Sequence, residues 1–269
     1  MTEAPPPLLR MVENIGRGAV RSLDEIGYAA ALLIESLYWV AVGHRLRQPV
    51  RAGAVIIQMM QIGVHALPIA TLLSATIGIM LAIQSLYSLG LFGAESFAHI
   101  GIALSVTREF SPLIMGILIA GRSGSSLSAR LSTMSISQEV DALRVIGINP
   151  VRFLVAPAVI GMVVMVPALT MWSNLVALGA SGLYVAGALQ ISLAAYFDGV
   201  IEVLAANDLM HGLGKSALFA VLIALIGVVN GSLVRGGAEG VGSATTKSVV
   251  QSISAIVITD MIFAFIATR

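Results

Sequence analysis

The stretch from Leu67 to Leu89, LPIATLLSATIGIMLAIQSLYSL, carries no charged side chain. An α-helix rises 1.5 Å per residue, so about 20 residues cross the hydrocarbon core of a bilayer. This stretch is long enough and apolar enough to do so. It therefore predicts a membrane-spanning helix.

The composition of the whole chain agrees with a membrane protein. Of its 269 residues, 57% are hydrophobic and only 11% are charged, and the mean hydropathy is +0.95. Soluble domains carry about 25% charged residues. A net charge of +1 supplies no basic field for nucleic acid, and the lack of cysteine excludes disulfide scaffolds and thiolate metal sites. We expect one all-α membrane domain.

Four further apolar stretches have the length of a span. They lie at residues 97–121, 153–176 with an apolar continuation, 215–234 and 248–267. We therefore expect a transmembrane domain of five membrane-spanning helices over residues 47–269.

The sequence before these spans is more polar. Residues 21–46 combine acidic residues with Tyr38 and Trp39 near the end of an apolar run, which favours a helix lying in the membrane interface. A sixth span is the alternative. Residues 1–20 are expected to form a cytoplasmic tail.

The distribution of basic residues predicts the orientation. With a cytoplasmic N-terminus, 12 of the 15 lysines and arginines fall on the cytoplasmic side, among them the cluster Arg45, Arg47 and Arg51. This places residues 122–152 and 235–247 in the cytoplasm and the C-terminus outside. Lys215 is expected at the outer edge of the fourth span.

A short amphipathic helix is predicted within the polar stretch from Arg122 to Arg152. Ser135 and Gln138 have the spacing of a capping box, apolar residues follow at helical spacing, and Gly147 is a natural stop. A cytoplasmic helix between two spans, here about 134–147, is a surface that a peripheral partner can hold. A helix that lies on the membrane without a partner is the alternative.

Four charged residues interrupt or border the apolar spans: Arg108, Glu109, Lys215 and Asp260. A charge within a span costs about 2.5–3.5 kcal/mol on insertion scales, so each needs a partner or a polar cavity. One interpretation is a water-accessible path for a charged lipid headgroup. The other is a set of structural ion pairs.

Small residues recur along the second span and beyond it. We expect them to allow close packing within one subunit, and a moving or dimer-forming helix is the alternative. The residues are Gly116, Ala120, Gly121, Gly124, Ser125, Ser128 and Ala129.

Motifs for catalysis are incomplete. Gly214-Lys215-Ser216 lacks the glycine that a phosphate-binding loop requires five residues earlier, where Leu209 stands, and the histidines lack metal-ligand spacing. We expect no enzymatic activity, catalytic residue, metal site or cofactor in this chain.

Several separated motifs together resemble one family. In order and spacing they are similar to the MlaE/YrbE permeases, over roughly residues 50–267. The motifs are Thr107-Arg-Glu-Phe-Ser-Pro112, Ala120-Gly-Arg-Ser-Gly124, Glu139-Val-Asp-Ala-Leu143, Ile146-Gly-Ile-Asn-Pro150, Asn230-Gly231, Gly242, Ala244-Thr-Thr-Lys-Ser-Val-Val250 and Asp260.

The resemblance implies the permease subunit of an ABC transporter that moves phospholipids between the inner and outer membranes. It implies a homodimer with an interfacial N-terminal helix and five spans, a cytoplasmic ATPase pair that uses ATP and Mg²⁺, and a periplasmic MCE-domain protein. It implies a lipid pathway near Arg108, Glu109, Lys215 and Asp260. It also implies ATPase contacts on the short helix, at Gln138, Glu139, Asp141, Leu143 and Arg144.

One position departs from the family, which commonly has Glu-Gln where this chain has Gln138-Glu139. The charge is thereby shifted by about 100° around the helix, which puts the residue that meets the ATPase in doubt. Two other functions stay open. One is an ion-coupled secondary transporter using Glu109 and Asp260, although five spans without a repeat argue against it. The other is a membrane scaffold without a transport cycle.

Overall fold

The computed structural model describes residues 7–43 and 48–267, so Arg45, Arg47 and the first six residues of the expected tail lie outside the described part. All regular elements of the described residues are helical. The longer helices are α1 (Pro7–Val42), α2 (Ala52–Ile62), α3 (Leu67–Gly90), α4 (Ala98–Ser105), α5 (Ser111–Ile119), α6 (Ser125–Ile136), α7 (Glu139–Val145), α8 (Ala156–Leu189), α9 (Leu193–Val203), α10 (Ala206–Ser232) and α11 (Ala238–Ala267). The short turns are η1 (Val64–Ala66), η2 (Glu95–Phe97), η3 (Val106–Phe110), η4 (Ala120–Gly124) and η5 (Val151–Val155), and the last three of these are π-helical.

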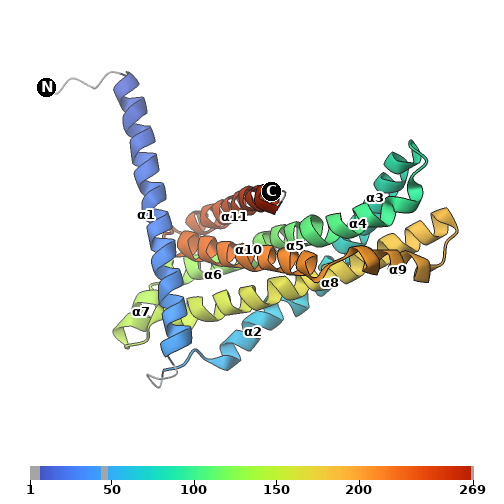
Figure 1. Cartoon of the computed structure of the whole chain (residues 1–269). Helices are drawn as coiled ribbons and strands as arrows, with labels where there is room; N and C mark the ends of the chain where they lie inside the picture. The colour runs from blue at the N-terminus through green and yellow to red at the C-terminus, as the bar shows by residue number, and fades with distance from the viewer. Residues whose placement is uncertain (1–6, 44–47, 268–269) are drawn as a thin grey trace.

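Adjacent elements join into five long apolar runs, and these form a bundle (Figure 1). Each run has the length and composition to cross a membrane, which confirms the five expected spans and the all-α membrane fold. The runs are Ala52–Gly90, Glu95–Ile136, Val151–Leu189, Ala206–Ser232 and Ala238–Ile266.

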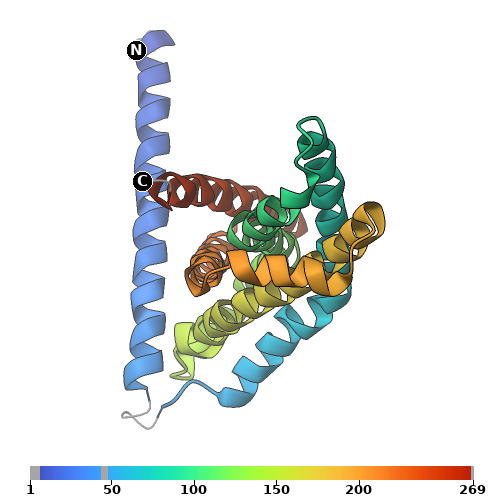
Figure 2. The same cartoon turned by 45° about the vertical axis from the view of Figure 1, so that its right-hand side comes forward.

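Helix α1 runs across the bundle rather than along it, as both views show (Figures 1 and 2). It begins at Pro7, where proline favours a helix start, so residues 7–20 of the expected tail are helical. Their cytoplasmic location stays a prediction. Its segment Leu23–Val42 also has the length and hydropathy of a span. Whether α1 lies in the interface therefore stays a prediction from its charges and aromatic residues.

Two acidic residues of α1 contact the bundle. Glu35 accepts a hydrogen bond from Asn149 Nδ2 at 2.8 Å, and Glu25 forms an ion pair with Lys247 at 2.8 Å. Two acids that made this helix appear too polar for a span therefore fasten it to the loop before η5 and to α11.

The second span is longer than predicted, because α6 continues it to Ile136. The polar stretch from Arg122 onward is thus not wholly outside the bundle, and Ser135 lies inside α6 rather than at a capping box. Hydroxyl groups explain the error, since Thr133 Oγ1 donates to the carbonyl of Ala129 one turn earlier, at 3.0 Å. A polar sequence can therefore pack as a helix, with Leu127 and Leu131 buried.

The small residues of this run pack within the subunit at four positions. A Cβ atom on Gly116 would crowd Phe219, and one on Gly124 would press on Ile223, both of α10. Ala120 and Ser128 are buried as well, whereas Gly121 is exposed. The close approach of α10 to this run follows from these positions.

The expected glycine-rich loop over residues 235–247 is also shorter than predicted. Helix α10 ends at Ser232 and α11 already begins at Ala238, so most of that segment is helical. Only residues 233–237 connect the two helices, with Gly236 at a positive φ of 89°. Such a backbone conformation favours glycine and allows the tight reversal.

Candidate functional site

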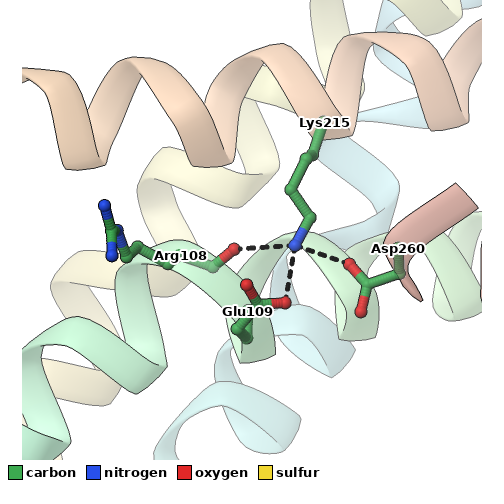
Figure 3. A network of polar contacts seen from close by, with 4 residues as sticks. All are labelled: Arg108, Glu109, Lys215 and Asp260. Carbon is green, nitrogen blue, oxygen red and sulfur yellow. Dashed lines mark hydrogen bonds and ion pairs between the residues drawn. The ribbon is translucent and has the colours of Figure 1, made fainter. Parts of the chain in front are cut away.

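Lys215 lies inside the bundle, with a side chain that is 0% exposed. The expectation that it sits at the outer edge is wrong, because α10 begins at Ala206 and carries the lysine inward. Its Nζ lies 2.6 Å from Glu109 Oε2 and 2.7 Å from Asp260 Oδ1 (Figure 3). We call Glu109, Lys215 and Asp260 the charge cluster. It joins three spans, since its members come from η3, α10 and α11.

A π-helical turn shapes one side of the charge cluster. Arg108 and Glu109 lie in η3, and the carbonyl oxygen of Arg108 accepts a hydrogen bond from Lys215 Nζ at 3.1 Å. Wider turns of this kind are frequent at functional sites and interrupt the regular hydrogen-bond ladder. Gly212 brings α10 close enough, because a Cβ atom there would collide with the carbonyl of Thr107.

The side chain of Arg108 points away from the charge cluster (Figure 3). Its Nε lies 2.8 Å from Oδ1 of Asp208, which is 10% exposed, near the start of α10. The other oxygen of Asp208 accepts from the backbone N–H of Ala205 at 2.9 Å. Sequence reasoning missed Asp208 as a partner, although an acid in the first turn of a helix is a known signal of its N-terminus.

The charge cluster is not electrically neutral. One lysine faces two carboxylates, so its net charge is −1 when all three groups are ionised, and the Arg108–Asp208 pair adds nothing to it. Glu109 is 37% exposed and Asp260 is 16% exposed, so the cluster is reached from the carboxylate side only. A buried lysine with two alternative partners can hold three spans together and can release one of them. Buried ion pairs contribute little to the net free energy of unfolding. Stabilisation of the fold alone therefore does not account for this arrangement, whereas a change of partner by Lys215 would.

Helix α7 lies at the end of the bundle opposite α4 and α9 (Figure 1). It contains no buried residue. Gln138, Glu139, Asp141 and Arg144 are exposed, and Leu143 is half-buried. The structure therefore presents the predicted coupling residues together on a surface and keeps them separate from the charge cluster.

The start of α7 differs from the prediction, whereas its C-terminal end confirms it. The helix starts at Glu139, after Gln138 in the left-handed conformation (φ 60°), and Ser137 Oγ donates to Glu139 Oε1 at 2.9 Å. It stops at Gly147 as predicted. The N–H groups of Gly147 and Ile148 donate to the carbonyls of Arg144 and Leu143, in the pattern of a Schellman motif.

Most of the chain matches a known protein family. A family model, Permease MlaE, matches residues 55–266, which include η3, α7 and the whole charge cluster. The chain belongs to the MlaE permease family.

Curated relatives of this MlaE-family chain agree with that assignment. A probable ABC transporter permease protein of Rickettsia conorii is 32% identical over 95% of this chain and 99% of its own length. A probable ABC transporter permease protein of Synechocystis is 34% identical over 78% of this chain and 80% of its own length. The chloroplastic protein TRIGALACTOSYLDIACYLGLYCEROL 1 of Arabidopsis thaliana is 31% identical over 81% of this chain and 66% of its own length.

These similarities define the coarse function. The MlaE-family chain is a multi-pass transporter permease of the ABC type, and permeases of this type work with ATPase partners.

Proposed function

We propose that the chain is the permease subunit of a phospholipid transporter that acts between the inner and outer membranes. The family assignment supports this, and the Arabidopsis relative is named for a glycolipid. In this proposal two copies form a homodimer in the inner membrane, with the N-terminus cytoplasmic and the C-terminus periplasmic. A separate ATPase uses ATP and Mg²⁺, and a periplasmic MCE-domain protein receives or delivers the lipid.

The observation that carries the proposal is the fully buried Lys215 between carboxylates of two other spans. Ionisable residues within membrane spans pair with one another and commonly mark substrate or ion pathways. The partly exposed Glu109 is the point where a polar headgroup can reach the cluster. In the proposed cycle Lys215 exchanges one carboxylate for the headgroup phosphate, and the spans that it joined separate.

Helix α7 is the proposed contact for the ATPase. Val145 is 87% exposed and Ile146 is 67% exposed, beside the charged Glu139, Asp141 and Arg144. Apolar side chains rimmed by charges at the end of a bundle are typical of a protein contact. Helix α7 follows the run Glu95–Ile136, which contains η3 with Glu109, so a movement of α7 can reach the charge cluster along that run.

The test is purification in mild detergent followed by reconstitution. The complex is expected to retain an ATPase and phospholipid, and to transfer phospholipid in an ATP-dependent manner without an ion gradient. Glu109→Gln and Asp260→Asn should reduce transfer at least tenfold while the complex still assembles. Asp198→Asn, an exposed acid of α9 outside the cluster, is the matched control. Transfer driven by a proton gradient without ATP would refute the proposal, as would loss of assembly in both cluster variants.

The α7 contact has its own test. Ile146→Glu places a charge on an exposed apolar position and should weaken ATPase binding without changing the thermal stability of the permease. Phe92→Glu, at an exposed position of the turn between α3 and η2, separates this effect from a general loss of apolar surface. Unchanged ATPase binding by Ile146→Glu would remove α7 as the contact.

A further inference from the structure

A second polar site lies away from the charge cluster, between α2, the η4–α6 segment and α8. It is a cavity of about 330 Å³ with polar and apolar walls. Its lining residues are Gln58, Gln61, Ile62, His65, Arg122, Ser123, Ser126, Leu127, Arg130 and Met162. Two of them are arginines, and none carries a carboxylate.

The two arginines have no counter-charge. Neither Arg122 nor Arg130 forms an ion pair with a described residue, and Nη1 of Arg122 is buried without a hydrogen-bond partner. In contrast, Arg108 and Lys215 both have carboxylates within 3 Å. A guanidinium with a buried N–H group that has no partner is costly, so the arrangement at Arg122 points to an anion that is brought by another molecule.

Gln58 contacts the guanidinium group of Arg130 without neutralising its charge. With its amide oxygen turned toward Arg130, it accepts from Nη1 at 2.9 Å and from Nη2 at 3.1 Å. A neutral amide orients the guanidinium without neutralising it. A glutamate at the same place would form a bidentate ion pair and fill the site.

We propose that this cavity binds the phosphate group of an amphiphile, with Arg122 and Arg130 as the anion-binding residues. The guanidinium fork matches phosphate oxygens, and Ser123 and Ser126 offer further hydroxyl donors. Ile62, Leu127 and Met162 supply an apolar wall beside the charges, which favours a lipid headgroup with its attached chains over a free ion. The site requires binding only, so it stands independently of the transport proposed above.

The experiment uses the purified full chain in maltoside detergent. Thermal unfolding is followed while short-chain phosphatidylglycerol, inorganic phosphate or additional maltoside is titrated. A ligand that binds only the folded state raises the unfolding temperature with concentration, which yields an apparent affinity. The wild type is expected to respond to phosphatidylglycerol at lower concentration than to inorganic phosphate, and not to maltoside.

Variants then test the residues. Arg122→Gln and Gln58→Glu should each weaken the apparent affinity for phosphatidylglycerol about tenfold or more, since each removes at least one charge-assisted hydrogen bond. Without lipid, Arg122→Gln should unfold at the wild-type temperature or above, because it removes an unpaired charge. Arg235→Gln, an exposed arginine between α10 and α11, is the matched control and should keep the wild-type affinity.

Other outcomes have definite meanings. An equal response to inorganic phosphate at equal concentration would assign the site to free phosphate rather than to lipid. Wild-type affinity in both Arg122→Gln and Gln58→Glu would overturn the site, as would an equal loss in Arg235→Gln. None of these results depends on phospholipid transfer, so they do not decide the proposed transport function.

Discussion

Replacing Lys215 by methionine is expected to destabilise the protein more than neutralising either carboxylate of the charge cluster. Lys215 is 0% exposed and lies within 2.7 Å of both carboxylates, so its loss leaves two negative groups facing each other inside the bundle. Methionine fills a similar volume, which confines the effect to charge.

The magnitudes follow from the burial of each partner. Removing one partner of a buried ion pair costs about 3–5 kcal/mol in free energy of unfolding, because the remaining charge is uncompensated. Lys215→Met falls in this range. Glu109→Gln should cost about 1 kcal/mol or less, since Glu109 is 37% exposed and Lys215 keeps Asp260. The triple variant Lys215→Met/Glu109→Gln/Asp260→Asn should recover most of the loss, because no buried charge remains.

The assay is thermal unfolding of the purified complex, combined with ATP-dependent phospholipid transfer. Stability should follow the order wild type, Glu109→Gln, Lys215→Met, with the triple variant close to the wild type. Transfer should be lost in the triple variant despite its recovered stability. If Lys215→Met were as stable as the wild type, the inferred ion pairs would not exist. If the triple variant transferred lipid normally, the charges would be structural and the proposed partner exchange would be wrong.

Three further substitutions test the contact of α10 with η3, the contact of α1 with the bundle, and the start of α7. In Gly212→Val the new side chain should collide with the carbonyl of Thr107 and lower the free energy of unfolding by at least about 2 kcal/mol, as measured by thermal unfolding. Gly214→Val, at an exposed position of α10, is the control. Asn149→Ala removes the hydrogen bond to Glu35 and should raise hydrogen exchange in α1 and η5; unchanged exchange would show that α1 is held otherwise. Gln138→Gly removes the strain of a left-handed backbone conformation and should stabilise α7 locally by up to about 1 kcal/mol. Slower hydrogen exchange in α7 would show this stabilisation.

The spans could be predicted because lipid imposes a simple requirement. Every backbone polar group must be paired inside the segment, so an uncharged stretch such as Leu67–Leu89 has to be helical, and it is. The grouping of Lys215 with Glu109 and Asp260 could be anticipated for a related reason, because isolated charges in a span are too costly.

Contacts that depend on the tertiary structure could not be predicted from the sequence. Serine and threonine hydroxyls can bond within their own helix, as Thr133 does, so the polar composition of this segment hid the continuation of the span into α6. The partner of Arg108 depends on how α10 approaches η3, and the sequence separation between Arg108 and Asp208 carries no sign of it. The unpaired state of Arg122 was equally invisible, because it is defined by which side chains fail to reach it.

The two polar sites have opposite charge, and this limits how a phosphate-bearing lipid could use them. The cavity of Arg122 and Arg130 offers two positive charges with no internal anion, so it attracts a phosphate group directly. With all three groups ionised, the charge cluster has one more negative than positive charge, so it repels a phosphate group in the observed arrangement. A headgroup can be accommodated there only when Lys215 gives up one carboxylate. The step that admits the headgroup is then the same step that loosens three spans from one another. The helical run Glu95–Ile136, which precedes α7 and contains Glu109, is the element through which an ATPase can drive it.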